Sequence, residues 1–267
     1  MSSSESAEKM APGTASGDGV VKPGGSGGGA TRFTVDDVQK LICHIVMALA
    51  TLVHFDLKSE ESIEREDGQE YTDNVMASIR RLLDNLCKLC SVIGVDLARV
   101  VVLKMRINRL KYDEDLCRQA ADVIKYNKMA GSVFLGKDAD SLLGLTRDEI
   151  FFRPWLAIKA AFLKERQALR AEAYHFGRSR GWLDKYTPMS VCMSMVAEVG
   201  ELAEVLQWKL RETPVEDLGD DVIDRLAREV ADVTIYLCHY ERICIYGDHS
   251  FRSGSQTEIR SMMSNIK

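Results

Sequence analysis

No proline falls between Pro23 and Pro154, although the chain has 267 residues and five prolines. Apolar residues within that stretch recur at intervals of three and four, the spacing that places them on one face of an α-helix. This spacing predicts helices over 35–57, 73–93 and 96–111. No run of Val, Ile or Tyr alternates with polar residues as a half-buried strand would require. An all-α fold is therefore expected.

The second half of the chain has the same helical spacing, which predicts helices over 154–181, 187–211 and 220–245. Residues 126–153 show weak periodicity and several small or turn-forming residues, so we interpret them as a connection. Residues 1–30 are mostly Ser, Gly, Ala and Pro. Such a segment buries too little apolar surface to offset its chain entropy, and a disordered tail is expected.

The chain contains an internal repeat. Residues 187–210 align without gaps with residues 34–57, and apolar side chains occupy most of the same positions in both segments. We interpret the chain as two tandem helical repeats, 31–125 and 154–267, joined by the connection. Since the apolar pattern is kept, both repeats are expected to contribute helices to a packed core.

Acidic residues of the second repeat have no counterparts in the first. They form two pairs with a spacing of three residues: Glu198, Glu201, Glu229 and Asp232. The aligned positions of the first repeat hold Ile45, Ala48, Ala77 and Arg80. Residues three apart share a helix face, so two adjacent antiparallel helices would bring the four carboxylates together.

A cluster of this kind needs cations. Unit charges about 4 Å apart repel by roughly 4 kcal/mol at an effective dielectric constant near 20. Oxygen ligands without His or Cys suit Mg²⁺, with Mn²⁺ as the alternative. A metal site in the second repeat is therefore expected; the competing interpretation is an acidic face in contact with solvent.

Two other metal sites were considered. A di-iron carboxylate bundle requires an ExxH pair on each of two helices, and only Glu172 and His175 have that spacing. Cys87 and Cys90 form a CxxC, but a zinc site needs a second pair of ligands, which is missing nearby. We therefore interpret these cysteines as half-buried residues of a helix.

The net charge of −5 excludes bulk electrostatic attraction to nucleic acid polymers or anionic membranes. No apolar run was judged long enough for a membrane span, and no signal peptide was recognised. The seven cysteines are accordingly expected to be reduced. These observations predict a cytoplasmic protein, with the nucleus as the alternative location.

The arrangement of the motifs resembles a known superfamily. ExxE followed after 27 residues by ExxD is similar to the MazG-like all-α nucleoside triphosphate pyrophosphohydrolases. Within this superfamily, GWLDKYTPMSVCMSMVAEVGELAEVLQWK is similar to the corresponding stretch of the animal dCTP pyrophosphatases. KMRINRLKY, residues 104–112, is similar to the segment that follows the acidic motif in those enzymes. The resemblance covers about 34–126 and 166–267. It implies hydrolysis of a (d)NTP, with dCTP or another pyrimidine nucleotide expected, to the monophosphate and pyrophosphate.

The resemblance also implies roles for individual residues. The four acids would hold Mg²⁺ and act in catalysis, with water attacking the α-phosphorus. The residues implied in substrate binding are Trp182, Tyr186, Trp208, Tyr236, Lys104, Asn108 and Tyr112. Tyr186 stands where the animal enzymes place a His, which leaves base recognition open. Plain core packing is the alternative for Trp182 and Trp208, and Glu204 is left outside the ligand set.

Each of the two repeats keeps residues of the family pattern that the other repeat lacks. Repeat one keeps Lys104, Asn108 and Tyr112 but lacks the acids, whereas repeat two keeps the acids and ends in a weak match to KMRIN. The resemblance implies homo-oligomers whose sites lie beside subunit interfaces. We expect two MazG-like repeats that form a four-helix-bundle-type pseudo-dimer, with repeat one lending cations and amides to the phosphates. A homodimer of the whole chain is a further expectation, and a catalytically weak nucleotide-binding or scaffold protein is the alternative function.

Overall fold

The computed structural model describes residues 32–61, 68–119 and 155–246 of the protein. The tail predicted for 1–30 and the connection predicted for 126–153 lie outside these residues, so both remain predictions. All the described residues belong to one compact unit.

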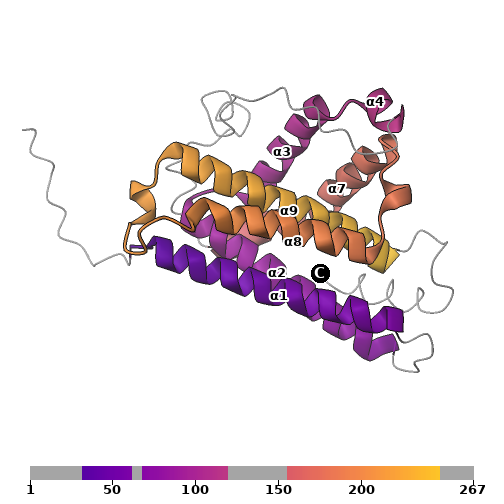
Figure 1. The fold of residues 1–267 in the computed structure, drawn as a ribbon, viewed down its shortest axis with the longest axis horizontal. Coiled ribbons are helices and arrows are strands. Elements are labelled where there is room, and N and C mark those ends of the chain that lie inside the picture. Colours follow the sequence, from indigo (N-terminus) through magenta and orange to yellow (C-terminus); the bar gives the residue numbers. More distant parts are fainter. Residues whose placement is uncertain (1–31, 62–67, 120–154, 247–267) are drawn as a thin grey trace, which may run out of the picture. The chain divides into compact units, whose positions relative to one another are not determined.

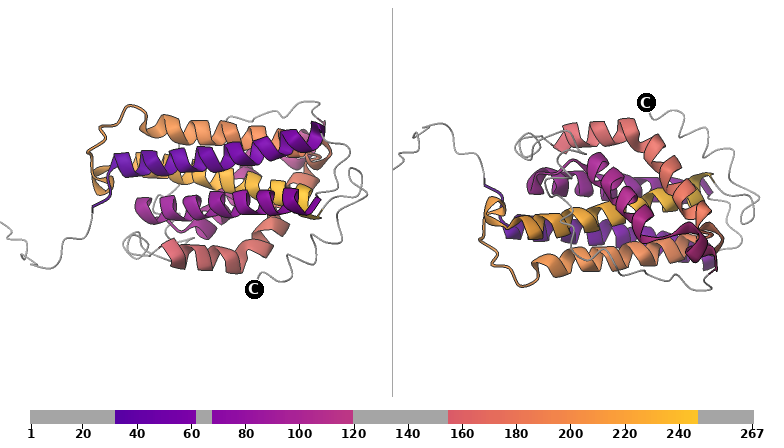
Figure 2. Two further views of the ribbon diagram at one scale, coloured as in Figure 1. Left: turned by 90° about the horizontal axis from the view of Figure 1, so that it is seen from below. Right: turned by 90° about the horizontal axis from the view of Figure 1, so that it is seen from above.

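Four long helices surround the main core: α1 (Val35–Glu61), α2 (Gly68–Ile93), α8 (Pro188–Leu206) and α9 (Asp220–Tyr246). Helices α1 and α2 form one antiparallel hairpin and α8 and α9 form another (Figure 1). Helix α1 packs along α8 and α2 packs along α9, and the two views of Figure 2 show this bundle from opposite sides. Their buried apolar side chains belong to one continuous core. The all-α class predicted from the apolar spacing is confirmed, and the pseudo-dimer remains an interpretation of the repeat.

The described part also contains three further α-helices and two short 3-10 helices: α3 (Leu97–Lys111), α4 (Glu114–Gln119), α7 (Trp155–Ser179), η1 (Leu183–Lys185) and η2 (Val215–Asp217). Helix α3 follows the first hairpin in sequence but packs against α7 and α9 (Figure 1). Helix α7 packs in addition against α2. This crossing of α3 brings residues of the first repeat beside the helix that carries two of the acids.

A sharp turn between α2 and α3 directs α3 across the bundle. Gly94 has a φ of 71°, in the left-handed region where a residue with a Cβ is strained. The backbone N–H of Val95 donates to the carbonyl of Cys90, and the Asp96 side chain accepts from the N–H of Arg99. The local sequence therefore both ends α2 and caps α3.

Helix α8 begins where the sequence indicates and ends earlier than expected. Thr187 and Ser190 form a capping box, and Pro188 occupies the first turn, where its missing N–H costs nothing. The helix predicted to run to residue 211 stops at Leu206. The last five residues of that prediction were wrong.

A tertiary contact explains this early end. The N–H groups of Val35 and Asp36 donate to the carbonyls of Thr213 and Arg211 at 2.9 and 3.0 Å, and Arg211 also forms an ion pair with the Asp36 carboxylate. The loop after α8 thus supplies partners for the free N–H groups at the start of α1.

Residues Val35–Leu57 of α1 are long and apolar enough to cross a membrane, by length and composition alone. The prediction that the chain has no such segment was wrong on this criterion. The core helix of a soluble protein satisfies the same criterion, and in the structure Ile45, Leu49 and Leu52 of α1 are buried in the bundle core.

The CxxC motif lies inside the bundle. Cys87 and Cys90 on α2 are fully buried, beyond the half-burial expected, and burial raises the pKa of the Cys87 thiol to about 12. Burial also raises the pKa of Cys90 well above its ordinary value. Thiols held neutral in an apolar core are poor metal ligands, and the cysteines therefore act as small core residues.

Candidate metal and substrate site

Three of the four predicted acids meet between α8 and α9. Each of Glu198, Glu229 and Asp232 offers a carboxylate oxygen, and these oxygens lie within 4.8 Å of one another. Glu201, one turn further along α8, is exposed, and its charge raises the pKa values of Glu198 and Glu229. The acidic site thus consists of three half-buried carboxylates with Glu201 at its solvent edge.

The carboxylates are held close together against their repulsion. Burial, followed by the neighbouring acids, raises the pKa of Glu198 to about 8. Burial and the Asp232 charge raise the pKa of Glu229 to about 7, although a hydrogen bond with Glu198 opposes the shift. That hydrogen bond needs a proton on one of the two groups. A divalent cation would replace this proton, and the all-oxygen donor set fits Mg²⁺.

Helix α3 supplies the groups that compensate the acidic charge. The Lys104 ammonium forms an ion pair with the Asp232 carboxylate, and the Asn108 side chain forms a hydrogen bond with the same group. Burial raises the pKa of Asp232, and these two contacts oppose the rise. Lys104 and Asn108 of the segment 31–125 therefore contact an acid of the segment 154–267, and their expected contact with phosphates stays a prediction.

An aromatic cluster lies beside the acids. The rings of Tyr112 and Trp182 meet edge to face with centroids 5.1 Å apart. The rings of Tyr186 and His239 do the same at 5.0 Å, and Tyr236 lies 6.4 Å from His239. The structure thus groups four of the aromatic residues that the sequence assigned to substrate binding. Tyr236 follows Asp232 by one helical turn, which places both groups on one face of α9.

His239 was missed in the sequence analysis. It follows Asp232 by seven residues and Tyr236 by three, so the helical spacing alone could have identified it. Its side chain is 2% exposed, and burial lowers its pKa to about 4. Its Nδ1 atom has no hydrogen-bond partner among the described residues, and the same holds for Nε1 of Trp182. Two buried polar atoms of the aromatic cluster are thus left without a partner in the described part of the chain.

Trp208 does not join this cluster. Its side chain is 88% exposed, and Leu210 beside it is 75% exposed. Because α8 ends at Leu206, Trp208 does not continue the helix face that carries Glu198. The alternative of plain core packing for Trp208 was therefore wrong, and its role as a pocket wall stays a prediction. Glu204 is exposed and lies outside the acidic group, in line with its omission from the ligand set.

The ExxH pair on α7 forms no metal site with other described residues. Glu172 binds Arg109 at 3.0 Å, and His175 is exposed. The acidic group between α8 and α9 contains no His. Within the described part of the chain, the ligands of a di-iron centre are therefore not brought together.

Comparison with known proteins gives partial matches to one enzyme. The chain is 36% identical over 80 residues to dCTP pyrophosphatase 1 of Bos taurus, which is 28% of this chain and 43% of the relative. It is 32% identical over 101 residues to dCTP pyrophosphatase 1 of Mus musculus (35% and 58%) and 38% identical over 77 residues to that of Homo sapiens (28% and 43%). The chain spans about half the length of these relatives.

No family model and no solved structure gives a significant match. The curated matches and the all-helical fold nevertheless confirm the relationship to the dCTP pyrophosphatases that the motifs predicted.

Proposed function

We propose that this protein is a Mg²⁺-dependent nucleoside triphosphate pyrophosphohydrolase that releases pyrophosphate from a pyrimidine deoxynucleotide such as dCTP. The main support is the grouping of Glu198, Glu229 and Asp232 beside Lys104 in a relative of dCTP pyrophosphatase 1. A scaffold protein has no evident need for carboxylates held close against their own repulsion.

The carboxylates would bind the metal. Glu198, Glu229 and Asp232 would hold Mg²⁺, or Mn²⁺ as the alternative, and Glu201 would complete the set from the edge of the site. When bound, the metal neutralises the triphosphate charge and lowers the pKa of a water molecule. Because Glu201 is exposed, it is also the acid best placed to accept a proton from a water that attacks the α-phosphorus.

Groups from α3 would position the triphosphate. The Lys104 ammonium and the Asn108 amide already lie beside Asp232 and offer N–H donors to phosphate oxygens. Tyr112, one turn beyond Asn108, connects this part of the site to the aromatic cluster through its ring contact with Trp182. The same helix would thus contact both the phosphates and the nucleoside.

The aromatic cluster would hold the base. Trp182, Tyr186 and Tyr236 offer ring faces and edges for a planar base to contact. The free N–H of Trp182 and the free ring nitrogen of His239 could form hydrogen bonds with the edge of the base. We propose a pyrimidine because the three relatives are named for dCTP.

The direct test is pyrophosphate release from a panel of dNTPs and NTPs with Mg²⁺. We expect release from wild type, highest with a pyrimidine deoxynucleotide, and a strong loss in Glu201→Ala. Glu204→Ala, an exposed acid one turn away, is the matched control and should behave as wild type. No release from any nucleotide would favour the nucleotide-binding or scaffold alternative.

Lys104→Ala should lower kcat/KM roughly 10- to 100-fold, because a charge-assisted hydrogen bond contributes about 1.5–3 kcal/mol. Arg106→Ala, an exposed residue of the same helix, is the control and should leave kcat/KM unchanged. Thermal melting should show that both variants remain folded. Unchanged kinetics in Lys104→Ala would contradict a phosphate-binding role for α3.

Exposed apolar side chains support the homodimer expected from the sequence. Val46 and Met47 on α1 and Met193 and Val196 on α8 are all at least 44% exposed. A second copy covering these two adjacent helices would bury an apolar surface that a single chain leaves in water. Trp208 is also available to such a partner.

A further inference from the structure

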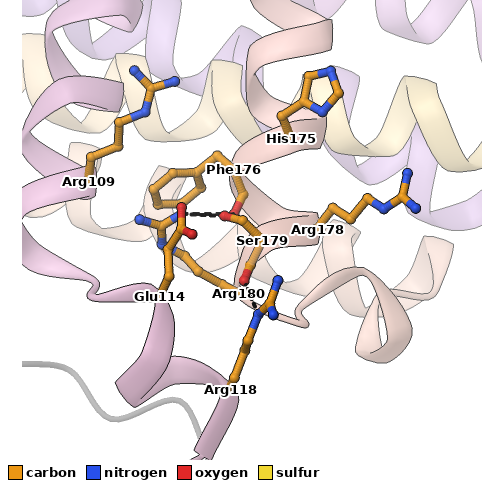
Figure 3. A pocket seen from close by; sticks show the side chains of 8 residues that line it. All are labelled: Arg109, Glu114, Arg118, His175, Phe176, Arg178, Ser179 and Arg180. Carbon is orange, nitrogen blue, oxygen red and sulfur yellow. Dashed lines mark hydrogen bonds and ion pairs between the residues drawn. The ribbon is translucent and has the colours of Figure 1, made fainter.

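A cavity is lined by residues other than those of the acidic site. Its volume is about 430 Å³, and its lining comes from the C-terminal end of α3, from α4, and from the end of α7 with the turn after it (Figure 3). The charged residues and the histidine that line it are Arg109, Arg118, Arg178, Arg180, Glu114 and His175. None of the four acids of the metal site takes part. We call this cavity the arginine pocket.

Two of the four arginines are neutralised within the protein. Arg109 binds the Glu172 carboxylate at 3.0 Å, and Arg180 binds the Glu114 carboxylate at 3.3 Å. The two ion pairs thus engage Glu114, which lines the pocket, and Glu172 of α7. Little negative charge is left for the remaining guanidinium groups.

The other two arginines have no carboxylate partner among the described residues. Nε of Arg118 donates to the backbone carbonyl of Ser179 at 2.6 Å, and the Arg178 guanidinium lies 6.0 Å from the centre of the Tyr174 ring. Neither contact neutralises charge. Within the described part of the chain, Arg118 and Arg178 thus add two positive charges without a paired carboxylate, on exposed side chains at the pocket, whereas the chain as a whole has a net charge of −5.

The floor of the pocket is rigid. Arg180 is 3% exposed, and its guanidinium lies 3.9 Å from the centre of the Phe176 ring. It donates to the carbonyl of Tyr112 at 2.8 Å, to that of Phe176 at 3.1 Å and to the Ser179 hydroxyl at 2.8 Å. Burial lowers the pKa of Arg180, which means that its charge is poorly solvated there. These contacts hold the Arg180 guanidinium and its partner Glu114 in place at the base of the pocket.

We propose that the arginine pocket binds a phosphate-bearing anion with at least two phosphoryl groups, as in pyrophosphate or the phosphate chain of a nucleotide. Guanidinium groups match phosphate oxygens with paired N–H donors. Two separate arginines without a carboxylate partner among the described residues, Arg118 and Arg178, match a multiply charged anion better than a single carboxylate. A volume of about 430 Å³ lies in the range of small-ligand sites.

Isothermal titration calorimetry of the full chain with inorganic pyrophosphate tests this proposal. The titration is run in EDTA at low salt, so that no divalent metal holds pyrophosphate at the acidic site. We expect saturable binding to wild type and at least about 10-fold weaker binding to the double variant Arg118→Glu/Arg178→Glu. The control Arg106→Glu/Arg225→Glu reverses two exposed arginines elsewhere and should bind as wild type. Thermal melting verifies that each variant is folded.

Further titrations distinguish free pyrophosphate from a nucleotide as the ligand, and the arginine pocket from the acidic site. Lys104→Ala should leave pyrophosphate binding in EDTA unchanged, because Lys104 belongs to the acidic site. Equal affinity for pyrophosphate and dCTP would identify the phosphate group alone as the ligand, whereas tighter dCTP binding would identify a nucleotide. Equal binding by wild type and the pocket variant, or equal loss in the control, would overturn the proposal. Neither result depends on whether the protein hydrolyses nucleotides.

Discussion

Glu198→Gln will lower the rate of pyrophosphate release on the order of 10³-fold, if the acidic group holds the catalytic metal. The amide keeps the size of the side chain but removes a negative oxygen ligand, and Glu198 is one of the three acids whose oxygens lie within 4.8 Å of one another. Initial rates at saturating Mg²⁺ and several nucleotide concentrations give kcat and KM. The loss should appear mainly in kcat, because the metal stabilises charge that develops in the transition state.

Glu204→Gln is the matched control for this experiment. It makes the same chemical change on the same helix, at an exposed position outside the acidic group. Its turnover should stay within about twofold of wild type, since surface changes away from a site have small effects. Similar losses in the two variants, or none in Glu198→Gln, would show that the acidic group is not the catalytic centre.

Mg²⁺ should stabilise the protein most at alkaline pH. The folded pKa values of about 8 for Glu198 and about 7 for Glu229 lie above the ordinary value of 4.5. A group whose pKa is raised on folding contributes stability at low pH that is lost as the pH rises through the folded pKa. In EDTA, the Tm of wild type should therefore fall between pH 6.5 and 8.5 because of these two acids.

This pH window separates the acids from His239. Burial lowers the pKa of His239 to about 4 from 6.5, so its contribution is present above pH 6.5 and lost below that value. It therefore changes stability in the opposite direction and outside the chosen window. Comparing wild type with Glu198→Gln removes the effects of the other titrating groups, which the two proteins share.

Metal addition should reverse the alkaline loss. A cation present at 100 times its Kd stabilises the folded state by about 2.7 kcal/mol, which raises the Tm of a domain of this size by roughly 5–10 °C. Thermal melts at pH 8.5 with and without Mg²⁺ measure the shift. Glu198→Gln should be more stable than wild type in EDTA and respond less to Mg²⁺. An identical Mg²⁺ response in both proteins would mean that the ion binds elsewhere.

Local sequence patterns were sufficient for the helices and for the acidic pairs. The spacing of apolar residues located every long helix described, because it reflects which side of each helix faces the core. The separation of Glu229 and Asp232 by three residues likewise placed both on one face of α9, where the structure has them. Both inferences rest on the geometry of a single helix, which the sequence carries in full.

Errors arose where a distant segment decides the outcome. The end of α8 depends on Val35 and Asp36, which take the carbonyls of the loop after Leu206 as partners. Trp208 lies beyond this end and is exposed, so only the core alternative for it was wrong. The membrane-span criterion met by α1 likewise concerns length and composition alone, whereas packing against α2 and α8 decides which of its apolar residues are buried, such as Ile45 and Leu52, and which stay exposed, such as Met47.

The sequence by itself determined the helices and the spacing of the acids, because each depends on residues close together in the chain. Only the tertiary structure decided that Lys104 faces Asp232, that His239 lies beside Tyr186, and that arginines from α3, α4 and α7 line one cavity. These groups meet because α3 crosses from the first hairpin onto α7 and α9. The packing of a helix against a partner far away in sequence is set by the fit of whole faces, which no local spacing specifies.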